Sequence, residues 1–434
     1  MTQPGELRQA SRSESGRFTA LVALPNLAEG LFRRRPAVSV LLDGIGVPHR
    51  AHRLLAALQS RYGDGPMWVS VAGKKTLLVF GPDQIQFALS HAPEPFASDP
   101  EPKRSGMEKF QPHALTISRG EHWSDRRRFT DAVLSTAAAD TTIQGRIRTV
   151  AADAAVAIPR EVDWHQFNAL VQRMARRIIL GDVAMHDDDI STQLATLMSK
   201  ANPPGKGDPE LYGRFFESLH HYVHVGEAGS LVGLFHRIPV TEETHPTHQV
   251  IHWLFAMGDT LAINLWRCLA LLANHPDMLS AAHMRVDAGD SRSYLTGCLC
   301  EAMRLWPSTP VLARTLTRDI EWNGRTVPEG TQVMIVNTFN HRDKSRIPYA
   351  DRFEPTAWVD HAADRSWSFN FFSHGPQRCP GADLALRLGV TFLAALLGDR
   401  HPDGTNVLLD PAQPLPLTLN HTRLRIGFAS RGRR

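Results

Sequence analysis

The chain has 434 residues, of which 42% are hydrophobic and 21% are charged. These values match soluble globular proteins and exclude a disordered chain, a collagen-like repeat and a coiled coil. The net charge of +4 is too weak to indicate a nucleic-acid partner, and four cysteines are too few for a disulfide scaffold. The length allows two to four ordinary domains or one large domain.

The first third of the chain mixes irregular and regular segments. We predict an irregular basic segment over residues 1–50, which contains Arg33-Arg34-Arg35. A helix follows over residues 51–62, and alternating apolar residues predict a β-hairpin over residues 68–80. Proline and charge dominate residues 93–113, which predicts a long loop of the kind that forms lids or binding segments.

Helical periodicity dominates the middle of the chain. It runs for about 160 residues after Gly120, with a Pro- and Gly-rich linker at residues 201–209. Residues 311–337 turn β-like around a hairpin turn at Trp322-Asn323-Gly324-Arg325.

An irregular Pro-rich stretch then leads to residue 380. It is followed by a predicted helix over residues 382–397 and a last hairpin formed by residues 415–419 and 424–428. We therefore expect a mainly α protein with small β-sheets, an α+β class. No domain boundary is evident, so residues 1–434 are predicted to form a single domain.

No segment has the pattern of a membrane anchor or a targeting signal. The most apolar long stretch, residues 250–273, is interrupted by Asp259 and Arg267, so it is expected to be a buried helix. The apolar run after Arg35 is too short for a twin-arginine signal. A soluble, cytoplasmic protein is expected.

The most informative segment surrounds Cys379, just before the predicted C-terminal helix. Phe372, Gly375, Cys379 and Gly381 fit the pattern F-x-x-G-x-x-x-C-x-G. A glycine permits a sharp turn, a helix N-terminus favours a thiolate, and an aromatic ring shields sulfur from water. The pattern resembles the haem-binding loop of the cytochrome P-450 family; the alternative is a structural cysteine in a Gly/Pro loop.

A second motif lies on a predicted helix upstream. Glu301 and Arg304 are three residues apart, so they share a helix face and can pair. The spacing resembles the E-x-x-R helix of the same family, and Arg352 lies in a downstream segment that matches it. The resemblance implies a buried Glu301–Arg304–Arg352 network, whereas an ordinary surface ion pair is the alternative.

A third motif is Trp123-x-x-x-Arg127, in which both side chains share a helix face. In the family this pair holds haem propionates, and Arg314 is the expected partner from the other side. The alternative is a basic helix with a core tryptophan. Neighbouring Arg126 and Arg128 are expected to face solvent.

A fourth motif lies within the apolar helix, where Ala256-Met257-Gly258 precede Asp259-Thr260. An acid and a hydroxyl are costly there unless they are used or satisfied. The family resemblance implies that Ala256 faces the haem and that Asp259 and Thr260 relay protons. The alternatives are a threonine bonded to its own helix and an aspartate paired with an arginine.

Two positions depart from the family pattern. Gln377 stands where Arg or His is common, which puts a propionate contact there in doubt, and the same holds for the adjacent Arg378. Met257 stands where a glycine is usual, so a thioether would narrow the oxygen groove. Oxygen activation is therefore less firmly implied than haem binding.

The resemblance implies a cytochrome P-450 fold, with a long central helix over the haem and the Cys-ligand loop before a C-terminal helix. It implies haem b and insertion of one atom of dioxygen into a small substrate, as in secondary metabolism. Because the sequence shows no flavin or iron–sulfur domain, electrons from NAD(P)H are expected through a ferredoxin and its reductase, which Arg126, Arg128 and Arg378 could dock. A monomer is expected.

Position within the family pattern suggests a largely apolar pocket, lined by Phe96, Met107, Phe110, Phe255, Met257, Val311, Leu312, Leu417 and Thr418. Alternative activities are peroxide-driven or ring-coupling chemistry and a haem-based sensor. The histidine groups His220/His221/His224 and His248/His252 show no third metal ligand in the sequence. Cys298 and Cys300 are expected to be packing residues.

Overall fold

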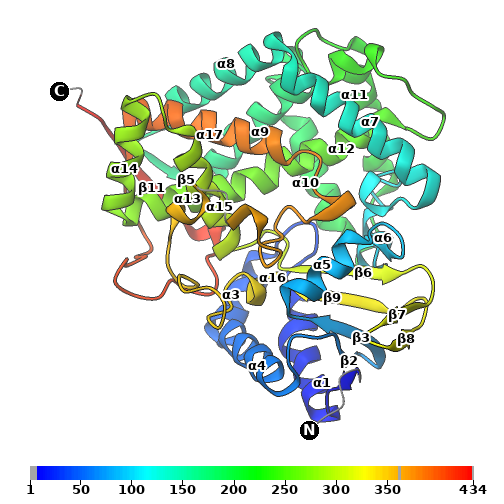
Figure 1. The fold of residues 1–434 in the computed structure, drawn as a ribbon. Helices are drawn as coiled ribbons and strands as arrows, with labels where there is room; N and C mark the ends of the chain where they lie inside the picture. The colour runs from blue at the N-terminus through cyan, green and yellow to red at the C-terminus, as the bar shows by residue number, and fades with distance from the viewer. Residues whose placement is uncertain (1–6, 360–362, 433–434) are drawn as a thin grey trace.

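The computed structural model describes residues 7–359 and 363–432. Helices form the upper part of the molecule in Figure 1, and the largest sheet lies at the lower right beside the N-terminal helices. The mainly α prediction with small sheets is confirmed.

The largest sheet has six strands in the order β1-β2-β3-β9-β6-β4. β2 and β3 form the predicted hairpin, in which Met67 pairs with Leu78. Leu78 packs in a hydrophobic cluster with helix α4 (Val47–Tyr62), and the neighbouring Leu77 packs in another cluster with helix α5 (Pro82–Ser90). The sheet is therefore covered on both faces. The strands are β1 (Arg8–Gln9), β2 (Met67–Val71), β3 (Lys74–Val79), β9 (Gln332–Val336), β6 (Val311–Leu316) and β4 (Phe96–Ala97).

A small hairpin joins β7 (Ile320–Trp322) and β8 (Arg325–Val327). Its two turn residues, Asn323 and Gly324, have φ values of 51° and 71°. Positive φ at both positions is what a type I′ hairpin turn requires. The turn predicted from these residues is therefore confirmed.

The helical part contains the main hydrophobic core, built around α9, α13, α15 and α17. The predicted helix after residue 381 is α17, and the predicted linker at residues 201–209 joins α10 to α11. These helices are α7 (Gly120–Ala139), α8 (Thr141–Ala157), α9 (Trp164–Ile179), α10 (Asp188–Ala201), α11 (Pro209–Val225), α12 (Pro246–Phe255), α13 (Leu261–Asn274), α14 (Pro276–Asp287), α15 (Arg292–Leu305) and α17 (Ala382–Asp399).

The central helix runs without a break from Pro246 to Asn274. It comprises α12, a π-helical turn η5 (Ala256–Thr260) and α13. Within the described residues it is the one helix whose length and composition would allow it to cross a membrane, yet 67% of its most apolar window is buried inside the molecule. Burial of this kind is typical of a core helix in a soluble protein, as the sequence predicts.

The prediction that residues 1–50 are irregular is wrong. The described part holds α1 (Arg12–Phe18), a π-helix η1 (Thr19–Ala23), α2 (Leu24–Ala28) and α3 (Pro36–Gly44), and α4 (Val47–Tyr62) starts within it. The prolines that suggested irregular chain stand at the first turn of α2, α3 and α4. Proline is well tolerated there, because the first-turn N–H groups have no helical acceptor.

Two other predictions need correction. Residues 93–113 are not one long loop: after the turn that follows α5 (Pro82–Ser90), they contain the strand β4 and a helix α6 (Glu101–Met107). The last hairpin does not form from residues 415–419: β11 (Arg425–Ser430) pairs instead with β10 (Arg400–Thr405) and β5 (Glu161–Asp163). Leu415 and Leu419 are buried singly in the core, so their spacing reflects burial and not a strand ladder.

The remaining segments are short. They comprise α16 (Asn337–Asn340) and the 3₁₀ turns η2 (Leu115–Ile117), η3 (Asp182–Ala184), η4 (Val232–Arg237), η6 (Pro355–Trp358), η7 (Ala363–Arg365), η8 (Gly375–Gln377) and η9 (His421–Arg423).

Candidate functional site

A cavity of about 1140 Å³ lies between the central helix, β6, α7 and the loop before α17. It exceeds the ~300–1,000 Å³ of most ligand pockets, so it has room for a large cofactor and a second molecule. Cys379, Asp259 and Thr260 all border it. The cavity therefore joins the cysteine motif to the acid–alcohol motif.

The Cys379 loop is folded tightly against α5. Gly375 has a φ of +66°, and a Cβ on it would lie 2.2 Å from the carbonyl oxygen of Leu89. The predicted need for glycine at this turn is thus confirmed. The Cys379 backbone N–H donates to the Phe372 carbonyl at 2.7 Å. Phe372 and Gly381 both border the cavity beside Cys379.

Cys379 is half-buried and borders the cavity. Burial raises its pKa, while the Gly381 backbone N–H and the charges of Arg378 and Arg127 act in the opposite direction. These three groups would favour a thiolate once a metal cation binds the sulfur, because metal binding displaces the thiol proton.

The other cysteines differ from Cys379 in their surroundings. Cys268, Cys298 and Cys300 are fully inside the core, where burial raises their pKa values. None of them borders the cavity. They are packing residues, as expected for Cys298 and Cys300.

The predicted pair Glu301–Arg304 is present on α15, and both side chains are fully buried. Arg304 donates to both carboxylate oxygens, Nε to Oε1 at 2.5 Å and Nη2 to Oε2 at 2.8 Å. The carboxylate also accepts the Trp358 indole N–H at 2.9 Å and the Glu354 backbone N–H at 2.8 Å.

The same arginine connects the pair to the cysteine loop. Arg304 donates to the carbonyl of His341 at 3.1 Å, and the imidazole of His341 accepts the backbone N–H of Asn370 at 3.1 Å. Asn370 in turn accepts the backbone N–H of Ser373 at 2.8 Å. A continuous chain of hydrogen bonds therefore runs from Glu301 to the segment that precedes Cys379.

The prediction that the Arg352 side chain completes this network is wrong. Arg352 contributes its backbone carbonyl, which accepts from Arg304 at 2.7 Å. Its guanidinium is exposed and, among the residues that the structure describes, donates only to the Pro348 carbonyl, at 3.5 Å. The indole of Trp358 occupies the position that the sequence assigned to a third charged residue.

Three cationic side chains border one part of the cavity, together with Trp123. Arg314 donates to Ser373 Oγ at 3.1 Å and to its own neighbour's carbonyl, while its buried Nε has no acceptor among the described residues. Burial lowers the pKa of Arg314 to about 10. Arg127 is paired with Asp131 at 2.7 Å and donates to the Arg378 carbonyl at 2.8 Å.

The third cation, Lys103 on α6, was missed by the sequence reasoning. Its ammonium lies inside the molecule, where it donates to the carbonyls of Ser98 and Thr116 at 2.8 and 2.9 Å. Burial, helped by the charge of Arg314, lowers the pKa of Lys103 to about 7. The residue lies in the segment predicted to be a loop, so the helix α6 that aims it could not be foreseen.

These groups fit an anionic, flat cofactor. Arg314 has a buried N–H without an acceptor, and Lys103 has a lowered pKa. Both side chains border the cavity, as expected for sites that hold carboxylates. Gln377 leaves its buried Oε1 without a donor among the described residues, and Arg378 points outward to Asp383. A Cβ at Gly381 would meet no protein atom within 4 Å, which leaves space beside the sulfur.

Arg126 is not at the surface, contrary to the prediction. It is 5% exposed and donates to the Glu243 carbonyl at 2.9 Å and to Ser118 Oγ at 2.6 Å. Arg128 is exposed, as predicted, and pairs with Asp125. The three consecutive arginines of α7 therefore face different surroundings: Arg126 the core, Arg127 the cavity and Arg128 the solvent.

Asp259 and Thr260 lie on the π-helical turn of the central helix, where both border the cavity. Asp259 Oδ1 accepts from Gln172 Nε2 at 3.1 Å and from Asn168 Nδ2 at 3.3 Å. Burial raises the pKa of Asp259, although Arg33 and these two amides act against it. The carboxyl is thus held from α9 and is able to carry a proton.

The glycine of this turn is at position 258. A Cβ there would lie 2.2 Å from Gln172 Oε1, so only glycine lets α9 approach closely enough for Gln172 to reach Asp259. Met257, which departs from the family pattern, is buried and borders the cavity. The glycine of this turn therefore lies one residue after the position at which the family pattern has it.

The predicted pocket residues divide into two groups. Met107, Phe255, Met257, Val311 and Leu312 border the cavity, and so does Ala256. Four others do not: Phe96 packs against Trp322, Phe110 packs against Phe32, Thr418 bonds Asp43 at the surface, and Leu417 lies outside the lining. Phe96 and Phe110 are fully buried in the core, which explains why aromatic residues in this segment do not reach the cavity.

One histidine group also differs from the expectation. His248 lies close to His113 and His245, with their ligand nitrogens all within 4.8 Å of one another. The sequence paired His248 with His252, whereas the structure groups His248 with His113 and His245. Arg126 donates to His113 Nδ1 at 3.3 Å, and a guanidinium at this position opposes a bound cation.

Comparisons with known proteins agree with this arrangement. Residues 240–399 match the family model for cytochrome P450. A solved structure, the cytochrome P450DA heme domain, aligns with a TM-score of 0.74 at 18% sequence identity and covers 89% of this chain and 92% of that one.

The similar curated proteins come from distant organisms. Probable cytochrome P450 4s3 of Drosophila melanogaster is 29% identical over 192 residues, which is 42% of this chain and 39% of that protein. Cyclooctat-9-en-7-ol 5-monooxygenase of Streptomyces melanosporofaciens is 28% identical over 151 residues, or 32% of this chain and 33% of that protein. The aligned region thus spans well under half the length of these relatives.

Proposed function

Because the chain belongs to the cytochrome P450 family, we propose that it is a haem-thiolate monooxygenase. It inserts one atom of dioxygen into a small, largely apolar organic substrate. The observation that carries the proposal is that Cys379, Asp259 and Thr260 border one large cavity. A thiolate ligand, a proton source and space for substrate are the three things such chemistry needs.

In this proposal haem b occupies the part of the cavity between Cys379 and the cations. Cys379 is the iron ligand, and Arg314, Lys103, Arg127 and Trp123 hold the propionates. The unmet Arg314 Nε and the suppressed pKa of Lys103 support this assignment, since each would gain from a carboxylate. When bound, the haem would supply dioxygen activation, which electron donation from a thiolate favours.

The residues around the iron site have separate tasks. Phe372 shields the sulfur, while the Gly381 N–H and Arg127 stabilise its negative charge. Asp259 holds a proton at its carboxyl and passes it toward Thr260 and the cavity, supported by its raised pKa and by the two amides that orient it. Phe255, Met257, Val311 and Leu312 exclude water from the substrate.

Electrons are proposed to come from NAD(P)H through a separate ferredoxin and its reductase, in the cytoplasm. Arg128 and Arg378 are exposed, and the Arg378 backbone contacts Arg127 beside the cysteine loop. A basic face at this point would steer an acidic partner. The rate of reduction by ferredoxin should then fall as salt is raised, and a salt-independent rate would contradict this docking site.

The decisive test of the function is optical and chemical. The reduced, carbon-monoxide-bound protein should show the red-shifted Soret band of thiolate-ligated haem, and Cys379→Ala should lose it. Persistence of that band in Cys379→Ala would overturn the ligand assignment. Product formed with a ferredoxin system, and not with peroxide alone, would distinguish the monooxygenase from a peroxide-driven enzyme or a haem sensor.

A further inference from the structure

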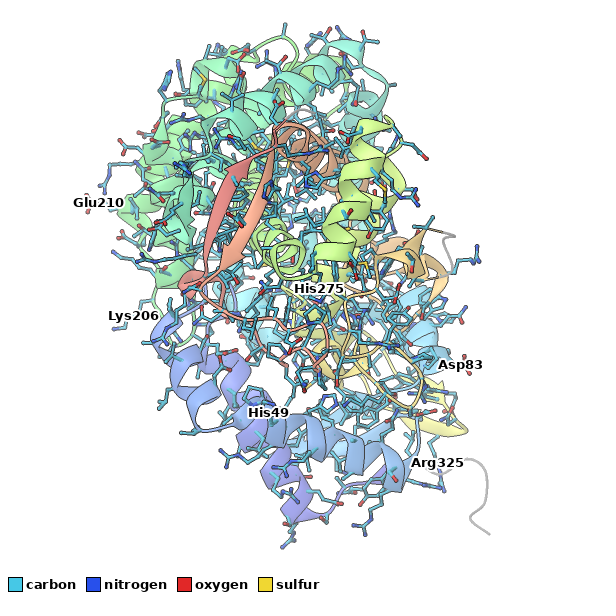
Figure 2. All side chains as sticks on the ribbon, turned by 90° about the vertical axis from the view of Figure 1, so that its left-hand side faces the viewer. His49, Asp83, Lys206, Glu210, His275 and Arg325 are labelled. Carbon is cyan, nitrogen blue, oxygen red and sulfur yellow. The ribbon has the colours of Figure 1, made fainter. Side chains whose placement is uncertain are left out.

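The loop at residues 29–35, between α2 and α3, forms part of the cavity wall. Arg33, Arg34 and Arg35 all border the cavity. Figure 2 shows Lys206, in the α10–α11 connection, next to the N-terminal helices that carry this loop. The triple-arginine sequence thus lies at the wall of the proposed substrate space.

The backbone of this loop is fixed by one buried side chain. Asn202, at the end of α10, accepts the Phe32 N–H at 2.9 Å and donates to the Arg33 carbonyl at 2.7 Å. Gly30 has a φ of +96°, and a Cβ there would lie 2.3 Å from the Arg33 carbonyl oxygen. The peptide group before Phe32 and the one after Arg33 are therefore held by the same amide.

The three arginines differ in their partners. Arg34 pairs with Glu29 at 2.7 Å. Arg35 donates to the carbonyls of Ala28 at 3.0 Å and Pro203 at 3.1 Å. Within residues 7–359 and 363–432, the Arg33 guanidinium has neither a hydrogen-bond acceptor nor an ion-pair partner. Its side chain borders the cavity and has its full set of donors available.

The surroundings of Arg33 carry an excess of positive charge. Arg267, on the same wall, donates to the Trp306 and Leu419 carbonyls, and its buried Nε has no described acceptor. His421 also borders the cavity, and burial together with Arg267, Arg34 and Arg33 keeps it neutral by lowering its pKa.

The acid whose pKa responds to Arg33 is Asp259. Its Oδ1 already accepts from two amides, and burial favours its neutral form. Among the described residues no ion pair joins Asp259 to Arg33, so the guanidinium keeps its donors. A guanidinium with free donors at a cavity wall attracts an anion of matching geometry, and a carboxylate matches its fork.

We propose that the substrate of this protein is an amphipathic carboxylate whose carboxyl group binds the Arg33 guanidinium. Its apolar part would extend along Phe255, Met257, Val311 and Leu312. The inference rests on the proposed monooxygenase function and specifies the substrate class for the same cavity.

The test compares acids with their primary alcohols by titration calorimetry on the haem-loaded protein. The pairs are dodecanoic acid and 1-dodecanol, geranic acid and geraniol, and 4-phenylbutanoic acid and 4-phenyl-1-butanol. At least one acid should bind ~10-fold more tightly than its alcohol, as expected for charge-assisted hydrogen bonds to a guanidinium. Arg33→Gln should abolish the preference, and Arg33→Lys should retain part of it.

The matched control is Glu29→Gln with Arg34→Gln, which removes one ion pair from the same loop without changing its net charge. It should keep the acid preference. Circular dichroism confirms that each variant is folded. The proposal is overturned if no acid is preferred, or if Arg33→Gln keeps the preference.

The carbon-monoxide spectrum of the same samples separates the two claims. A thiolate-type band without an acid preference would reject the substrate class alone. An acid preference without that band would reject the monooxygenase function alone, because calorimetry detects binding whatever the iron ligand is.

Discussion

Glu301 and Arg304 differ from Asp259 and Arg33 in how their buried charges are satisfied. The carboxylate of Glu301 accepts four hydrogen bonds, and Arg304 donates to that carboxylate and to four backbone carbonyls. Among the described residues, the Asp259 carboxyl accepts hydrogen bonds from two side-chain amides only, and the Arg33 guanidinium has no partner. The first pair is built to hold structure, whereas the second set keeps capacity for a proton or a ligand.

The largest expected effect comes from breaking the satisfied pair. Glu301→Gln leaves Arg304 buried without its counter-charge, which should destabilise the protein by about 3–5 kcal/mol. The chain of bonds through His341 should also loosen the Cys379 loop. Urea unfolding followed by circular dichroism would measure the loss, and haem content would report the loop. A stability equal to wild type would show that the pair is not structural.

Removing the carboxyl of Asp259 should impair activity and not stability. Asp259→Asn keeps an acceptor for Gln172 and Asn168 but cannot release a proton, so the rate of product formation should fall on the order of 100-fold. The rate of product formation at saturating ferredoxin would measure it. An unchanged rate would remove Asp259 from the proton path.

The difference in stability between wild type and Asp259→Asn should depend on pH, and its sign follows from the pKa of Asp259. Burial raises the folded-state pKa of Asp259, so above that pKa the native protein holds a desolvated charge that the unfolded chain holds in water. Asp259 therefore lowers stability at high pH, and this cost vanishes below its unfolded pKa of about 3.9. The variant should be at least as stable as wild type at neutral pH, unlike Glu301→Gln.

Lys103 gives a pH dependence of stability with the opposite slope. Its folded pKa of about 7 lies below the unfolded value, so the unfolded chain binds more protons between the two. Stability of the haem-free protein should rise with pH above 7 by up to ~1.4 kcal/mol per unit. Lys103→Met should lack this rise, and haem loading should flatten it if a propionate keeps the ammonium charged. A slope shared by wild type and variant would contradict the assignment.

The smallest effect is expected at Arg352. Because only its backbone carbonyl meets Arg304, Arg352→Ala should change stability by no more than about 0.5 kcal/mol. Thermal unfolding beside Glu301→Gln is the comparison. A loss of several kcal/mol in the free energy of unfolding would show that the Arg352 guanidinium does take part in the network.

The sequence predicted the parts of the site whose residues are close together in the chain. The spacing of Glu301 and Arg304 on one helix turn, the Gly375 turn before Cys379 and the two-residue turn at Asn323-Gly324 each follow from local geometry, and each is present. Local rules are enough where an interaction spans three or four residues.

The sequence failed where placement depends on distant packing. Lys103 and Arg33 reach the cavity because α6 and the residue 29–35 loop are held by residues far along the chain, including Asn202. Arg126 differs from Arg127 and Arg128 only by rotation about α7, and no periodicity sets which arginine of three is buried. Trp358 could replace Arg352 because an indole N–H can donate to a carboxylate as well.

The hydrogen bonds from Asn202 to the residue 29–35 loop have a consequence for the kinetics of ligand binding. Its two hydrogen bonds belong to one amide, 170 residues from Phe32 in the sequence, so they form and break together. We expect this stretch of the wall to swing outward as one body whenever α10 and α11 move apart. Residence time inside the protein would then be set at the helix connection, far from any atom that touches the bound molecule, while its preferred pose would not change.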